Sequence, residues 1–118
     1  MSTILIIDDE YLIAEILGMA LEDEGYEVVK AANGAKGLEL IEQAQPHLVI
    51  TDYMMPVMNG LEFAQKLRQS DQRVPIILMS GAQANQFRDD PLFAAVFDKP
   101  FRTEDIIATV RSFIQPAA

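Results

Sequence analysis

Short apolar runs alternate with amphipathic segments along this chain, and that alternation limits the possible folds more than any other feature. The runs at 4–7, 48–50 and 75–79 are continuous in apolar residues, as strands buried on both faces of a sheet are. Weaker runs at 26–30 and 96–98 predict two further strands. Strands that alternate with helices predict an α/β fold, in which helices cover both faces of an open parallel sheet.

The segments between the predicted strands carry apolar residues at the spacing of an amphipathic helix. After the first strand, Leu12, Ile13 and Ile16 follow this spacing. Residues 84–95 should give only a short or irregular helix, because Pro91 interrupts them. The other helices are predicted at about 10–24, 34–45, 61–69 and 103–115, with Thr103 as the expected N-cap of the last one.

Length, composition and charge narrow the classes of function. The chain has 118 residues, enough for one domain, which we place at 1–118 with no output domain. Its formal net charge of -9 disfavours binding to nucleic acid, whose phosphates would be repelled. There is no cysteine, no apolar run of membrane-spanning length and no basic segment of a signal peptide at the N-terminus. We therefore expect a cytoplasmic protein that does not bind membranes.

Polar side chains stand where the predicted strands end. Asp8 and Asp9 follow the first strand, Asp52 the third, Ser80 the fourth and Lys99 the fifth. The carboxyl ends of parallel strands meet at one edge of the sheet, and ligands bind there in open α/β folds. We therefore expect three carboxylates, a hydroxyl and an ammonium group in one pocket. Asp52 is the expected reacting centre, because it ends the central strand and precedes a loop with free backbone groups.

Clustered carboxylates favour a bound cation. Three carboxylates so close together repel one another, and a hard cation removes that repulsion. Mg²⁺ prefers oxygen ligands and commonly uses one or two carboxylates together with phosphate oxygens. Asp9, Asp52 and the backbone carbonyl of Met54 would suit Mg²⁺, and Asp8 could act through a bound water.

The remaining polar groups suit phosphoryl transfer. That chemistry needs mainly positioning and charge neutralisation, which a metal ion, the Lys99 ammonium and the Ser80 hydroxyl would supply. A carboxylate can serve as the nucleophile and form an aspartyl phosphate. The pattern therefore indicates phosphoryl transfer to Asp52, with Lys99 and Ser80 as the other catalytic residues.

With these motifs in place, the chain resembles the receiver domain of the response-regulator family in two-component signalling. The matching motifs are Asp8-Asp9, 52–60, Ser80-Gly81-Ala82 and Lys99-Pro100-Phe101, and the resemblance extends over the whole chain. The resemblance implies a flavodoxin-like (βα)5 sheet with strand order 2-1-3-4-5 and a cis Lys99–Pro100 bond.

The resemblance also implies a role for each matching residue. Asp52 would be the phosphoacceptor, and Asp8 and Asp9 the acidic pair that binds metal. Ser80 would be the switch hydroxyl, and Lys99 would contact the phosphoryl group.

A donor and a signalling mode are implied as well. A histidine kinase or histidine phosphotransfer protein would donate the phosphoryl group to Asp52. Phosphorylation would shift an equilibrium between two conformations. The signal would then leave through contact with a downstream protein or by phosphorelay. On this interpretation the protein is not an enzyme, beyond catalysing its own phosphotransfer and its slow self-dephosphorylation.

The chain departs from the usual receiver pattern in two places. Receivers usually carry an aromatic residue three positions before the lysine, where this chain has Val96. Phe97 comes one place later and should face the other way, because side chains alternate along a strand. The segment from Ser80 to Lys99 is also short for the family. Which face of the domain signals is therefore open.

Two further residues bear on the lifetime of an aspartyl phosphate. Met54 and Ala82 stand two places beyond Asp52 and Ser80, beside the expected path of an attacking water. Neither side chain can orient that water. We therefore expect self-dephosphorylation to be slow compared with receivers that carry polar groups at these positions.

Other interpretations compete with this one. Taken alone, Asp8 and Asp9 could simply cap the first helix. A second class of function is a phosphatase of the haloacid-dehalogenase type, but those enzymes usually place a second acid two residues after the nucleophile, where this chain has Met54. The acidic pocket disfavours a flavodoxin-type flavin carrier. A degenerate receiver that is never phosphorylated is a further alternative, although every required side chain is present.

Overall fold

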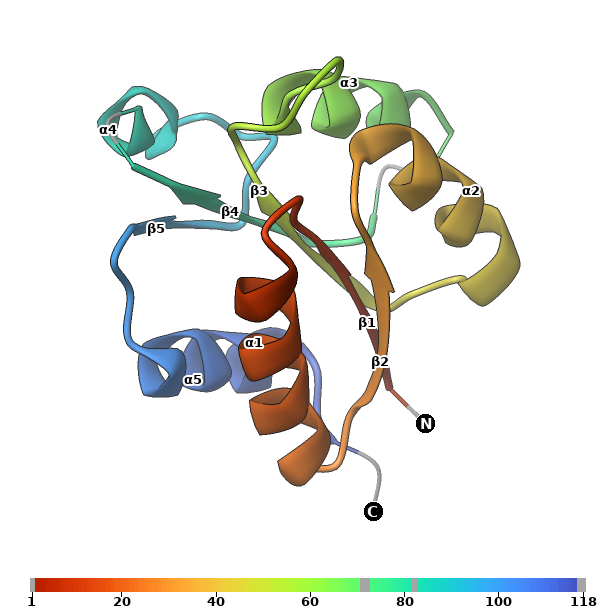
Figure 1. Ribbon diagram of the computed structural model, residues 1–118, viewed down its shortest axis with the longest axis vertical. Coiled ribbons are helices and arrows are strands. Elements are labelled where there is room, and N and C mark those ends of the chain that lie inside the picture. The colour runs from red at the N-terminus through yellow and green to blue at the C-terminus, as the bar shows by residue number, and fades with distance from the viewer. Residues whose placement is uncertain (1, 71–72, 82, 117–118) are drawn as a thin grey trace.

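The computed structural model describes residues 2–70, 73–81 and 83–116, and in this part strands and helices alternate along the chain (Figure 1). The strands are β1 (Thr3–Ile7), β2 (Glu27–Ala31), β3 (Leu48–Asp52), β4 (Ile76–Ser80) and β5 (Ala95–Asp98). The helices are α1 (Tyr11–Asp23), α2 (Gly34–Ala44), α3 (Gly60–Ser70), α4 (Ala84–Phe87) and α5 (Thr103–Phe113).

The strands form one parallel sheet in the order β2-β1-β3-β4-β5. Helices α1 and α5 cover one face, and α2 and α3 cover the other (Figure 1). This arrangement confirms the predicted flavodoxin-like α/β fold. In the same part of the chain, no helix combines the length and the apolar character needed to span a bilayer.

The three central strands are buried along their whole length, as their continuous apolar runs predict. Alternate side chains of β1 enter the two halves of the core. Leu5 and Ile7 pack toward α2 and α3, whereas Ile4 and Ile6 pack toward α1 and α5. The buried central strands thus form a rigid platform for the residues at their carboxyl ends.

The edge strand β5 carries the departure from the usual receiver pattern. Val96 packs against the part of the core that contains Phe87 and Phe93, whereas Phe97 packs with the α1 and α5 side chains. This confirms that Phe97 faces the opposite side of the sheet from Val96. On the face of β5 to which Val96 points, this strand carries no aromatic side chain.

Hydrogen bonds fix the loop between β3 and α3. The Gly60 N–H donates to the carbonyl oxygen of Tyr53 at 2.8 Å. A Cβ atom at position 60 would lie 2.6 Å from the carbonyl oxygen of Asp52, so only glycine allows this close return of the chain. The Asn59 N–H donates to Glu62 Oε1 at 3.0 Å, and the Glu62 N–H donates to Asn59 Oδ1 at 2.9 Å. This reciprocal cap of α3 fixes the backbone beside the strand end.

The predicted element boundaries differ from the observed ones by small amounts. Several strands are shifted or extended by one residue; β4, for example, runs one residue past the predicted end and includes Ser80. Thr103, predicted to cap the last helix, is instead its first residue, and Arg102 holds the extended N-cap conformation. The short helix expected within 84–95 is confirmed as α4, and the Lys99–Pro100 bond is cis as expected.

Candidate functional site

The carboxyl edge of the sheet brings together side chains from separate segments of the chain. Asp8 follows β1, Asp52 ends β3, Ser80 ends β4 and Lys99 follows β5. The Lys99 Nζ atom lies 3.0 Å from Asp52 Oδ1 and 3.8 Å from Asp8 Oδ2. Asp8, Asp52 and Lys99 therefore share one site, with the ammonium group of Lys99 between two carboxylates.

Asp52 lies at the bottom of this site and is buried. Burial raises the pKa of Asp52 above its ordinary value, because water no longer stabilises the charge. The hydrogen bond and the charge of Lys99 oppose this change, and the negative charge of Asp9 adds to it. The Lys99 ammonium group therefore favours the ionised form of this buried carboxylate.

Asp8 is buried, and only one of its two carboxylate oxygens accepts a hydrogen bond from the described residues. Its Oδ1 atom accepts a hydrogen bond from the Glu10 N–H at 2.9 Å. Its Oδ2 atom is buried and has no hydrogen-bond partner among the described residues. Burial is the main cause that raises the pKa of Asp8 to about 6, and the charge of Asp52 contributes.

Ser80 ends β4, and Lys99 follows the neighbouring strand β5. The backbone N–H of Lys99 donates a hydrogen bond to the backbone carbonyl oxygen of Ser80 at 2.9 Å, which fixes the backbones of the two residues relative to each other. Ser80 is buried, and its Oγ atom has no hydrogen-bond partner within the described parts of the chain. Burial lowers the pKa of Lys99, but the hydrogen bond to Asp52 and the charges of the surrounding carboxylates outweigh it, so the net pKa is raised.

The cavity above Asp52 has a volume of about 480 Å³. Its lining residues include both predicted and unpredicted groups: Asp9, Glu10, Asp52, Met54, Gly81, Gln83 and Lys99. Asp9 is exposed at its rim, and Met54 is largely exposed. Ala82, named above in connection with the phosphate lifetime, lies outside the described residues. The cavity is open to solvent next to the buried carboxylate, as a phosphoryl acceptor requires.

Sequence reasoning missed Glu10. One carboxylate oxygen from each of Asp8, Glu10 and Asp52 lies within 4.8 Å of the others, an arrangement that could hold a metal ion. Asp9, predicted as a metal ligand, is not part of this closest group. Glu10 is the third acidic residue in the run Asp8-Asp9-Glu10, and that run could have indicated a place in the site. The helical spacing that follows predicts only that a helix starts at Glu10.

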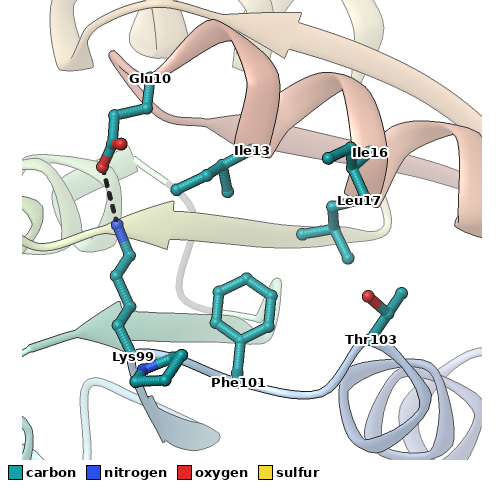
Figure 2. Close-up of a pocket in the computed structure, with 8 residues that line it drawn as sticks. Glu10, Ile13, Ile16, Leu17, Lys99, Phe101 and Thr103 are labelled. Carbon is teal, nitrogen blue, oxygen red and sulfur yellow. Dashed lines mark ion pairs between the residues drawn. The ribbon is translucent and has the colours of Figure 1, made fainter.

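A second cavity, of about 520 Å³, lies beside the site between α1 and the segment that follows β5 (Figure 2). Ile13, Leu17 and Phe101 lie on its apolar walls, and Glu10 and Lys99 close one end. Its walls carry few groups able to react with a phosphoryl group. The chemistry of the site therefore belongs to the acidic cavity, and the apolar cavity is its neighbour.

The comparisons with known proteins agree with this geometry. Over 116 residues, the chain is 32% identical to the probable transcriptional regulatory protein TcrX of Mycobacterium tuberculosis, covering 96% of this chain and 50% of that protein. Over 114 residues it is 30% identical to sporulation initiation phosphotransferase F of Bacillus subtilis, covering 94% of this chain and 92% of that protein. The chain spans about half the length of the first curated relatives that it matches.

A solved structure of similar sequence has the same fold. The response regulator TrrA of Thermotoga maritima, solved in complex with Mg²⁺-BeF, is 32% identical and superposes with a TM-score of 0.85, covering 97% of this chain and 100% of that one. The family model of the response regulator receiver domain matches residues 4–111. The comparisons do not support the haloacid-dehalogenase alternative. The chain therefore belongs to the response regulator receiver domain family.

Proposed function

We propose that Asp52 is the phosphoacceptor of this receiver domain and that Lys99 and Ser80 hold the phosphoryl group. The observation that carries the proposal is the position of the Asp52 carboxylate. It lies at the end of the central strand, 3.0 Å from the Lys99 ammonium group, at the bottom of an open cavity. The Ser80 hydroxyl, which has no hydrogen-bond partner among the residues that the structure describes, is a further donor for a phosphoryl oxygen.

In the proposed reaction, a carboxylate oxygen of Asp52 attacks the phosphorus atom of the donor. The new oxygen–phosphorus bond forms as the bond between phosphorus and the donor's leaving atom breaks, and the leaving group takes the bonding electrons. Negative charge then develops on phosphoryl oxygens, where Lys99 and Ser80 can stabilise it. Neither residue needs to act as an acid or a base.

Mg²⁺ is the proposed cofactor, and the donor atoms present in the site suit it. Asp8, Asp9, Asp52 and the backbone carbonyl of Met54 would supply the oxygen ligands that Mg²⁺ prefers. The Oδ2 atom of Asp8 is buried and has no hydrogen-bond partner among the described residues, and this is the independent observation that favours a cation at this site. When bound, Mg²⁺ would neutralise carboxylate and phosphoryl charge.

We also propose the partners expected from the sequence: a histidine kinase or histidine phosphotransfer protein as donor, and a downstream protein as receiver of the signal. Receiver domains are signalling proteins, and we propose no turnover of an external substrate beyond self-phosphorylation and self-dephosphorylation. The net charge of -9 supports contact with proteins and disfavours direct contact with nucleic acid. A cytoplasmic location and the domain boundaries 1–118 stay predictions.

Treatment with acetyl phosphate and Mg²⁺, followed by intact mass measurement, tests the proposal. We expect a gain of about one phosphoryl group per chain, since one acceptor is proposed. Asp52→Asn should abolish that gain. Asp23→Asn, which makes the same change at the exposed end of α1, should retain it. Labelling that persists in Asp52→Asn would refute the assignment. The same measurement followed over time checks the slow self-dephosphorylation, which loss within seconds would contradict.

A further inference from the structure

The Glu10 side chain stands between the two cavities, and the function proposed above gives it no role. The acidic cavity beside Asp52 and the apolar cavity beside α1 share two lining residues, Glu10 and Lys99. Figure 2 shows these two side chains reaching toward each other from the start of α1 and from the end of β5. Their ion pair therefore forms the boundary between the cavities.

Lys99 has three carboxylates around its ammonium group. Its Nζ atom lies 3.0 Å from Asp52, 3.6 Å from Glu10 and 3.8 Å from Asp8. The side chains of Asp8 and Asp52 are buried, whereas 63% of the Glu10 side chain is exposed. Glu10 is thus the partner that can part from Lys99 without any movement of the sheet.

The backbone of Glu10 is fixed on both sides, so its side chain starts from a defined position. Its N–H donates to Asp8 Oδ1 at 2.9 Å, and its carbonyl oxygen accepts hydrogen bonds from the N–H groups of Ile13 and Ala14. Glu10 occupies the N-cap position of α1, but its side chain makes no capping hydrogen bond. Ser, Thr, Asp and Asn are the residues preferred there, because they can cap the helix. The Glu10 side chain pairs with Lys99 instead.

We propose that Glu10 is a positioning residue. In the resting protein the Lys99 ammonium group pairs with both Glu10 and Asp52, and the pairing with Glu10 delays the movement of Lys99 toward an incoming phosphoryl group. This inference rests on the proposed phosphorylation of Asp52. Lys99 must turn toward the phosphoryl oxygens in the transition state, and its interaction with Glu10 weakens as it does so. An interaction that is stronger in the ground state than in the transition state raises the barrier. Glu10 therefore slows phosphorylation.

The rate of phosphorylation by acetyl phosphate and Mg²⁺, followed by intact mass, is the first test. We expect Glu10→Gln to raise this rate by about 2- to 5-fold, the range for loss of an ion pair with one exposed partner. Glu39→Gln removes the same charge on α2, where Glu39 pairs with Lys36, and should leave the rate unchanged. An unchanged rate in Glu10→Gln would overturn the proposal.

A double-mutant cycle distinguishes positioning from simple repulsion of the anionic donor. In a Lys99→Met background, Glu10→Gln should no longer alter the rate, because Glu10 acts through Lys99. An equal increase in both backgrounds would show that Glu10 acts by its charge alone, and would overturn the proposal.

A measurement that needs no phosphorylation completes the test. In NMR spectra of the lysine ε-methylene groups, Glu10→Gln should shift the Lys99 resonance and Glu39→Gln should not. A Lys99 resonance that does not move in Glu10→Gln would refute the shared ion pair. Because this readout does not require phosphorylation of Asp52, it also separates a failure of this inference from a failure of the proposed phosphoacceptor.

Discussion

Asp8 combines burial with incomplete hydrogen bonding, and both have an energetic consequence. Its pKa in the folded protein is raised from the ordinary 3.8 to about 6, chiefly by burial. A raised carboxyl pKa means that the folded state binds the proton more tightly than the unfolded state does. The stability contributed by protonated Asp8 is therefore fully present below about pH 4 and is lost as the pH rises to about 6.

Without Mg²⁺, Asp8→Asn should stabilise the protein at pH 7 by about 2–3 kcal/mol, the value that corresponds to this pKa change. The amide oxygen can still accept the hydrogen bond from the Glu10 N–H, while the charge is removed. Urea unfolding in EDTA measures the effect, which should disappear near pH 4. Asp23→Asn, at an exposed position, should change the unfolding free energy by less than about 0.5 kcal/mol. Equal stability of Asp8→Asn and the unaltered protein at pH 7 would contradict the prediction.

At the scale of single residues, the sequence identified most of the site. Asp8, Asp52, Ser80 and Lys99 could be placed together because each follows a recognisable strand, and parallel strands end at the same edge. Glu10 could not be placed, because it starts a helix and the direction of its side chain depends on where Lys99 lies. That information is absent from any local pattern.

At the scale of elements, α4 is the least regular part of the fold. The helix has four residues, too few to be stable without tertiary contacts. Phe87 supplies such contacts: its ring centroid lies 5.1 Å from that of Tyr53 and 5.7 Å from that of Phe93. Tyr53 directly follows Asp52, so this aromatic cluster connects the site to α4.

Phe87→Ala should destabilise the domain by about 3–4 kcal/mol, since it leaves a cavity in the core next to Tyr53. Gln86→Ala, on the exposed side of the same helix, should cost less than about 0.5 kcal/mol. Urea unfolding monitored by circular dichroism compares the two. A loss in Phe87→Ala as small as that in Gln86→Ala would show that the aromatic cluster does not hold α4 in place.

At the scale of the whole molecule, the negative net charge and the acidic site both favour the binding of a cation. The chain carries a formal charge of -9, and several carboxylates crowd one edge of its sheet. A cation bound only to the folded state would stabilise that state by mass action. The proposed Mg²⁺ site therefore predicts a stability that depends on metal concentration.

Mg²⁺ at 100 times its dissociation constant should raise the unfolding free energy by about 2.7 kcal/mol, and EDTA should reverse the gain. The measurement is urea unfolding with and without Mg²⁺, with NaCl at matched ionic strength as a control for screening of the net charge. Asp8→Asn should lose most of this response, and Asp23→Asn should keep it. An equal response in both variants would indicate general screening instead of a site.

The order of the elements, the buried central strands and the edge of the sheet that carries the site were determined by the sequence alone. Continuous apolar runs and helical spacing are local patterns that predict a parallel sheet, whereas the order of the strands was implied only by the resemblance to receiver domains. Only the tertiary structure decided that Glu10 meets Lys99, that one oxygen of Asp8 has no hydrogen-bond partner in the described part of the chain and that α4 is anchored by Phe87. The physical reason is that these features depend on side chains from distant segments meeting in space, and their distances are set by packing across the whole sheet.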